Sequence, residues 1–97
     1  MKYRLMFMPA TIRDRNIIKA YLSQFYPGTS KRFFAHLKKK TARIKEHPLS
    51  YPSYEKNPIY RKMVVDDYLV FYVVFDTHVE IHRIIHAKKN TYTLSDK

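Results

Sequence analysis

The chain has 97 residues, of which 45% are hydrophobic and one is glycine, so it can bury a core and is predicted to fold as one domain over residues 1–97. The absence of cysteine excludes a disulfide scaffold and thiolate chemistry, and it fits a cytoplasmic location. Nineteen Lys and Arg against eight Asp and Glu give a formal charge of +11, which predicts an anionic partner: nucleic acid, an acidic protein or a ribosome. No apolar run is as long as a membrane span, and the first residues lack a signal-peptide pattern, so no membrane partner is expected.

The first predicted elements are a strand and a helix. Apolar and polar residues alternate over Lys2–Phe7, which predicts a half-buried strand that Pro9 ends. Thr11 is expected to cap the helix, with Asp14 as its capping-box partner at the third position. Apolar residues at helical spacing are expected to share the inner face: Ile17, Ile18, Tyr21, Leu22 and Phe25. The helix is expected to end at residues 26–28, Tyr-Pro-Gly.

A second helix is predicted to begin at a cap formed by Thr29 or Ser30 and to end at His47-Pro48. Because the connection is short, the two helices are expected to form an antiparallel hairpin. The inner face of the second helix is predicted from its apolar spacing: Phe33, Phe34, Leu37, Thr41 and Ile44.

The same helix carries a run of cations without any acid between Arg15 and Lys45. Its cations are Lys31, Arg32, Lys38, Lys39, Lys40, Arg43 and Lys45. A solvated surface explains each lysine taken singly, whereas the set together would attract a polyanion. We therefore place Lys38, Lys39 and Lys40 among the candidate target-binding residues.

Three strands are predicted to follow an ordered loop at Pro48–Pro58. They cover Tyr60–Val65, Tyr68–Phe75 and Val79–Ile85, and two-residue breaks separate them, as in hairpins. The middle strand is apolar at both parities, which predicts burial on both faces. The expected fold class is α+β: strand, helix, helix, three strands, with the helical hairpin on one face of a mainly antiparallel four-stranded sheet.

The last strand and its end hold the candidate catalytic groups. His82 and His86 are expected on one strand face, where they could serve as base and acid in RNA cleavage; the alternative is that both are ordinary packing histidines. Only Glu80 lies near them at ligand spacing, so neither a metal nor a cofactor is expected. Lys88 and Lys89 follow the strand, where they are either a basic tail that reaches a partner or a frayed terminus.

Two arginines lie within apolar patterns. Arg83 is in phase with Val79, Ile81 and Ile85, so it is expected either to pair with an acid or to contact the target. Arg61 poses the same choice. Three tyrosines in irregular segments could stack on bases or on side chains of a partner: Tyr51, Tyr54 and Tyr92.

The order of these elements resembles the RelE/ParE superfamily of bacterial toxins. The local matches are His47–Pro52 after the hairpin, Tyr60–Lys62 opening a strand, Tyr68–Tyr72 in the next strand, and the ending Glu80-Ile81, Ile84-Ile85 and His86–Lys89. The resemblance implies a growth-arresting toxin of a type II toxin–antitoxin system and, as its partner, a co-expressed acidic antitoxin that wraps around it.

The superfamily divides by target. RelE-like members cut mRNA on the translating ribosome with basic side chains, and ParE-like members poison DNA gyrase. Leu69 stands where the nucleases place an arginine, and Met63 stands where they place a second basic residue, so the chain is closer to ParE. A nuclease would rely on Arg61, Arg83, His86, Lys89 and Tyr92. A gyrase poison would use Arg61, Arg83, Lys88, Lys89, Lys38, Lys39 and Lys40 as contacts. A third hypothesis is a basic nucleic-acid-binding or adaptor domain that has lost toxicity.

Overall fold

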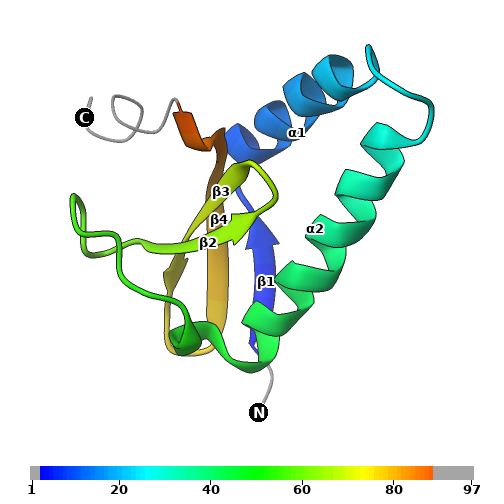
Figure 1. The fold of residues 1–97 in the computed structure, drawn as a ribbon. Coiled ribbons are helices and arrows are strands. Elements are labelled where there is room, and N and C mark those ends of the chain that lie inside the picture. The colour runs from blue at the N-terminus through cyan, green and yellow to red at the C-terminus, as the bar shows by residue number, and fades with distance from the viewer. Residues whose placement is uncertain (1–2, 89–97) are drawn as a thin grey trace.

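The computed structural model describes residues 3–88, which form a four-stranded mixed sheet and two helices (Figure 1). The elements are β1 (Arg4–Phe7), α1 (Pro9–Leu22), α2 (Thr29–Glu46), the 3-10 turn η1 (Pro48–Ser50), β2 (Arg61–Val65), β3 (Tyr68–Val74) and β4 (His78–His86). The sheet order is β1-β4-β3-β2, with β1 parallel to β4 and the other pairs antiparallel. The predicted element order and the mainly antiparallel sheet are confirmed. Within residues 3–88, no helix is both long and apolar enough to cross a membrane.

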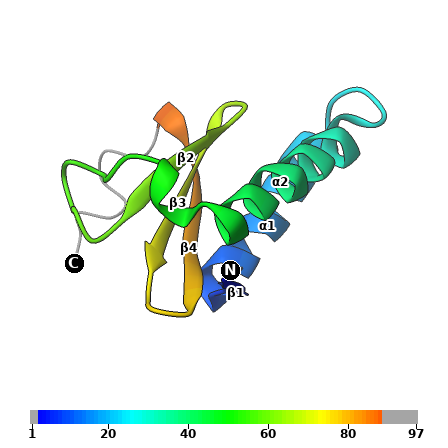
Figure 2. The ribbon, with the colours of Figure 1, turned by 90° about the horizontal axis from the view of Figure 1, so that it is seen from below.

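Strand β3 is buried on both faces, as its sequence predicts. Tyr68, Val70 and Tyr72 belong to the core under the helices, whereas Leu69 and Phe71 belong to a smaller cluster on the opposite face. Figure 2 shows the helices on one side of the sheet and the segment before β2 on the other. That segment is ordered, since its own backbone hydrogen bonds close it and its Tyr54 and Tyr60 cover the smaller cluster. We call the side away from the helices the outer face.

A bulge in β4 changes which side chains share a face. Phe71 pairs with Arg83 and the next residue of β3, Tyr72, pairs with Ile81, so His82 is an extra residue in β4. Because side chains alternate along a strand, the extra residue reverses the parity beyond it. The expected phase of Arg83 with Ile81 is therefore wrong.

Helix α1 begins earlier than its sequence predicts and uses its first polar residues differently. It starts at Pro9, a favourable first position for proline, with Met8 before it and no side-chain cap. Thr11 Oγ1 donates to the carbonyl of Ile81 at 2.7 Å, and Asp14 accepts from Ile84 N at 2.9 Å. Thr11 therefore bonds β4 at its last pair with β1, Asp14 bonds the part of β4 beyond that pair, and the expected capping box at Thr11 is wrong.

The inner face of α1 is narrower than its apolar pattern predicts. Ile18 is buried and Leu22 packs against the core, but Ile17, Tyr21 and Phe25 are 68%, 49% and 50% exposed. The helix ends at Leu22, four residues before the expected stop. Only the part of α1 that lies along β4 has a surface on which to bury apolar side chains.

Helix α2 matches its predicted face. Phe33, Leu37, Thr41 and Ile44 are buried, and Phe34 is half-buried. The helix begins at Thr29 after Gly28, whose φ of 89° suits glycine, and no side chain caps it. Figure 1 shows α1 and α2 running in opposite directions and diverging from their connecting loop, so the hairpin is splayed.

Candidate functional site

Arg83 joins β4 to α1. Its Nε and Nη2 donate to the Asp14 carboxylate at 2.8 and 3.0 Å, and Asp14 is 8% exposed. The hydrogen bond from Arg83 to Asp14 raises the pKa of the guanidinium above its ordinary value, which keeps it charged. Of the two alternatives expected for Arg83, the structure shows the pairing with an acid, and this cation is engaged in a contact within the fold.

Arg61 holds the segment that follows α2. Its Nη1 donates to the carbonyl of Tyr51 at 2.6 Å, and the carbonyl of Leu49 lies 3.4 Å from the same nitrogen. Tyr72, fully buried beside it, donates its hydroxyl to the carbonyl of Pro48 at 2.7 Å, and burial raises the pKa of this phenol. Two side chains of the sheet thus satisfy backbone carbonyls that η1 and its flanks leave unpaired.

His82 lies in a hydrogen-bonded chain on the outer face. Its Nε2 is 3.0 Å from Glu80 Oε1 and its Nδ1 is 3.2 Å from the hydroxyl of Tyr60. Because a carboxylate only accepts, Nε2 donates to Glu80, and in the neutral ring Nδ1 accepts from Tyr60. His78 Nε2 lies 3.2 Å from the other oxygen of Glu80. These two imidazoles lower the pKa of the Glu80 carboxyl, His82 contributing most.

His86 lies apart from His82. The ring of His86 packs edge-on against Tyr68, a core residue on the helix side, with centroids 5.2 Å apart. The ring of His82 packs against Tyr60 on the outer face at 5.3 Å. The expectation that both histidines share one strand face is wrong, because the bulge reverses the parity between them. They cannot act as base and acid on one phosphate.

The three consecutive lysines of α2 do not form one contact surface. Successive helical residues point about 100° apart, so Lys38, Lys39 and Lys40 face three directions. Lys38 and Lys39 are exposed, and Lys40 is half-buried. Lys88 is exposed after β4, while Lys89 and Tyr92 lie outside the described residues.

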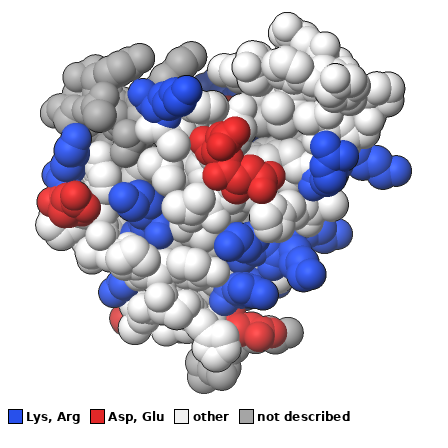
Figure 3. Space-filling model, in the orientation of Figure 1, with Lys and Arg blue, Asp and Glu red and all other residues white. Residues whose placement is uncertain are grey.

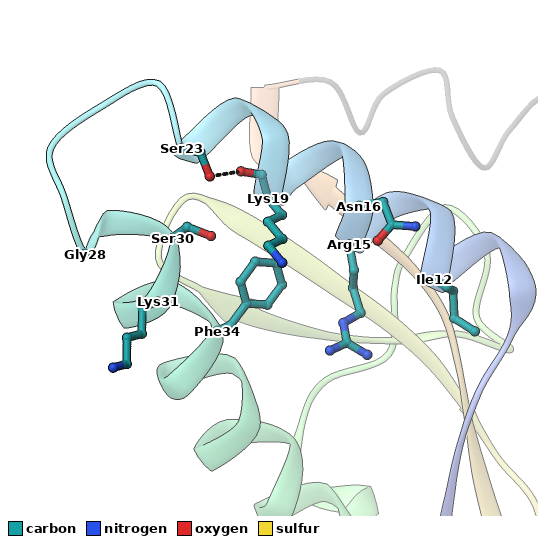
Figure 4. Close-up of a pocket in the computed structure, with 9 residues that line it drawn as sticks. All are labelled: Ile12, Arg15, Asn16, Lys19, Ser23, Gly28, Ser30, Lys31 and Phe34. Atoms are coloured by element: carbon teal, nitrogen blue, oxygen red, sulfur yellow. Dashed lines mark hydrogen bonds between the residues drawn. The ribbon is translucent and has the colours of Figure 1, made fainter.

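A hollow of about 780 Å³ lies between the two helices (Figure 4). Arg15 and Lys19 extend from α1 into it, and the ring of Phe34 comes from α2 (Figure 4). A second hollow, of about 610 Å³, continues between α2 and β1 and is lined by Leu5 and Phe7. The two hollows share Arg15, Lys31 and Phe34, so they are adjacent, and we call the two together the helix groove.

The helix groove combines apolar walls with cations. The Arg15 guanidinium lies over the rings of Phe7 and Phe34, 5.7 and 5.8 Å from their centroids. Lys31, Lys38 and Lys45 line the groove from α2 at intervals of seven residues, which places them in one row along the helix. We call these three the groove lysines. No acidic residue is among those that line either hollow in the described part of the chain.

The sequence alone does not predict the helix groove as a site. Arg15 and Phe34 come from different helices, and the angle between the helices cannot be derived from either periodicity. One signal was present, because the seven-residue spacing of the groove lysines predicts a single row. Among the described residues, no group of three His, Asp or Glu side chains could hold a metal ion.

The helical hairpin on one face of a four-stranded mixed sheet, in the predicted element order, is the fold that the resemblance to the RelE/ParE superfamily implies. The chain matches the family described as ParE toxin of type II toxin-antitoxin system, parDE, over residues 5–91, and it belongs to this family. It is thus the toxin component of such a system, whose partner is an antitoxin.

The fold is shared with a solved chain of the chromosomal ParDE TA system from P. aeruginosa, at a TM-score of 0.74 and 12% sequence identity. The similarity covers 88% of this chain and 96% of that chain. None of the curated proteins compared with the chain matches it in sequence. The predicted superfamily and the preference for its ParE branch are therefore confirmed.

Proposed function

We propose that the chain arrests growth by binding and inhibiting DNA gyrase, with no side chain acting as a base. The observation that carries this proposal is that three of the candidate nuclease groups are held by contacts within the fold. Arg83 is paired with Asp14, Arg61 bonds the carbonyl of Tyr51, and both ring nitrogens of His82 are engaged. A metal-independent nuclease needs such groups free to meet the reacting phosphate.

The substitutions at the two nuclease positions also support this choice. Leu69 is 7% exposed in the outer cluster, and Met63 is fully buried in the core under the helices. An apolar side chain cannot neutralise a scissile phosphate, and removing one charge-stabilising donor typically raises a barrier by about 3 kcal/mol. A RelE-like mRNA endonuclease, or a non-toxic adaptor, is the alternative, and the nuclease would then depend on His86, Lys89 and Tyr92.

The antitoxin is proposed to be acidic and to lie in the helix groove. The groove offers apolar contacts at Phe7 and Phe34, and its charged lining residues are all cations. An amphipathic acidic segment fits such a lining, because its apolar side chains would cover the rings and its carboxylates would meet the groove lysines. Toxin, antitoxin and gyrase would meet in the cytoplasm.

The antitoxin site can be tested by reversing charges in the groove. Replacing Lys31, Lys38 and Lys45 by Glu should weaken the affinity for the purified antitoxin and reduce its dependence on salt. The control is Lys56→Glu, an exposed cation in the segment before β2. Affinity that is equal in the triple variant and the wild type would place the antitoxin elsewhere.

The target can be tested in cells. Induced expression without the antitoxin should produce gyrase-dependent DNA damage and leave ribosome-bound mRNA intact. Codon-positioned mRNA cuts in the same cells, lost on Lys89→Ala or Tyr92→Phe, would move the protein to the nuclease branch.

A further inference from the structure

Helix α2 carries a second set of cations that does not line the helix groove. Arg32, Lys39 and Arg43 are exposed, and we call them the outer row. At about 100° per residue these three lie within about 40° of one another around the helix axis, and their mean direction is about 120° from that of the groove lysines. Figure 3 shows Lys and Arg side chains gathered along α2 on the face that it presents.

The outer row is free of ion pairs among the described residues. The side-chain ion pairs there join His36 to Asp66, His78 and His82 to Glu80, and Arg83 to Asp14. None of them includes Arg32, Lys39 or Arg43. Unpaired and exposed, these cations keep their full charge available to an anion.

Helix stability does not explain the row. Cations are stabilising near the C-terminal end of a helix and unfavourable near its N-terminal end, where the dipole is positive. Arg43 lies in the last turn, but Arg32 is the fourth residue of α2, and the first turn contains no acid to compensate. A solvated surface with no partner would be served as well by Glu or Gln at that position.

We propose that the outer row binds the phosphate backbone of double-stranded DNA. From Arg32 to Arg43 the helix rises about 16 Å, at 1.5 Å per residue, which spans about five phosphates of one strand at 3.4 Å each. This proposal rests on the proposed function in one respect: the duplex that the outer row contacts would be the DNA held by gyrase. The contact would let the toxin bind the enzyme–DNA complex rather than gyrase alone.

The composition of the row favours a duplex over a single strand. Proteins that bind single strands combine cations with aromatic side chains on which bases stack. The row contains no aromatic ring, and the phenylalanines of α2, Phe33 and Phe34, face the core and the helix groove. Phosphate contacts alone position a protein on a duplex without reading its sequence, so binding is expected to be independent of base sequence.

The test measures salt-dependent binding of the full-length protein to a fluorescent 20-base-pair duplex. For the wild type, the logarithm of the affinity should fall linearly with the logarithm of salt, with a slope of about −0.9 for each phosphate neutralised. Replacing Arg32, Lys39 and Arg43 by Gln should make that slope shallower by about 2.7, because three such contacts are lost. Circular dichroism would verify that each variant remains folded.

The matched control replaces the groove lysines Lys31, Lys38 and Lys45 by Gln. It removes the same charge from the same helix, so it should change the slope much less. Equal effects of the two triple variants would overturn the proposal, because net charge alone would then explain binding. An unchanged slope in the outer-row variant, or tighter binding of single-stranded DNA or duplex RNA than of duplex DNA, would also overturn it.

The two proposals fail separately. A wild-type protein that leaves gyrase uninhibited, while the outer-row variant alone loses duplex binding, contradicts the gyrase function and supports the DNA contact. If the wild-type protein inhibits gyrase but the outer-row variant binds the duplex as well as the wild type does, the gyrase function is supported and the DNA contact is contradicted.

Discussion

Arg83 and Asp14 stand 69 residues apart in the sequence and meet through two hydrogen bonds, of 2.8 and 3.0 Å. The same carboxylate accepts the backbone N–H of Ile84 at 2.9 Å. The Asp14 side chain of α1 therefore accepts hydrogen bonds from both the Arg83 guanidinium and a backbone N–H of β4. This contact attaches the first helix to the last strand.

Replacing Asp14 by Ala should destabilise the fold by about 2 kcal/mol, since a partly buried guanidinium and a backbone N–H would lose their acceptor. Asp14→Asn keeps an acceptor oxygen and should cost less. Urea unfolding of the purified toxin, or of its antitoxin complex, would measure both. An Ala variant as stable as the wild type would show that water replaces the carboxylate.

Thr11 makes a second bond between α1 and β4. It is fully buried and donates to the carbonyl of Ile81, which also accepts from Met8 N at 3.0 Å. Thr11→Val keeps the shape and removes the donor, and the carbonyl keeps one partner, so we expect a loss of about 1 kcal/mol. Thr11→Ala should cost more, because it also leaves a cavity. Equal losses in the two variants would contradict this order.

Glu80 should make stability depend on pH in the acid range. His82 and His78 lower the pKa of its carboxyl below the ordinary 4.5. A group with a depressed pKa in the folded state contributes stability above the unfolded value and loses it as the pH falls through the folded value. The difference in unfolding free energy between the wild type and Glu80→Gln should therefore shrink as the pH falls below about 4.5.

The control for this measurement is Glu55→Gln, at an exposed position before β2. Its difference from the wild type should change less over the same range. A Glu80→Gln difference that does not change between pH 5.5 and pH 3 would contradict the hydrogen-bonded chain on the outer face.

Replacing Arg61 distinguishes a structural role of this side chain from a role in binding the target. Arg61→Ala removes the donor to the carbonyl of Tyr51, and hydrogen bonds from charged groups contribute about 1.5–3 kcal/mol. We expect a loss of about 1.5 kcal/mol by thermal or urea unfolding, with Lys56→Ala as the neutral control. A variant of unchanged stability that no longer binds the target would make Arg61 a contact residue instead.

The fold could be predicted from local patterns because each element has its own period. The alternation over β1, the apolar β3 and the inner face of α2 all lie where the sequence places them. The predictions that failed depend on relations between distant segments. The bulge at His82 is defined by the pairing of β4 with β3, and it moves His82 and His86 to opposite faces.

The site was harder to predict for the same reason. The sequence indicates that Arg83 needs an acid, but it does not say that Asp14 supplies it. The pattern on α1 gives Ile17 and Tyr21 an inner position, yet the sheet does not extend far enough to cover them. The run Lys38–Lys40 looks like one patch in the sequence, whereas helical geometry distributes its members around α2.

Gyrase inhibition without catalysis by the toxin can be tested in one pair of reactions. The most direct measurement incubates the purified protein with purified gyrase and relaxed plasmid DNA, and in parallel with translating ribosomes. We predict blocked supercoiling or trapped cleaved DNA, reversed by the antitoxin, together with intact mRNA on the ribosomes. Full supercoiling activity accompanied by codon-positioned mRNA cleavage would instead show that the protein is a nuclease.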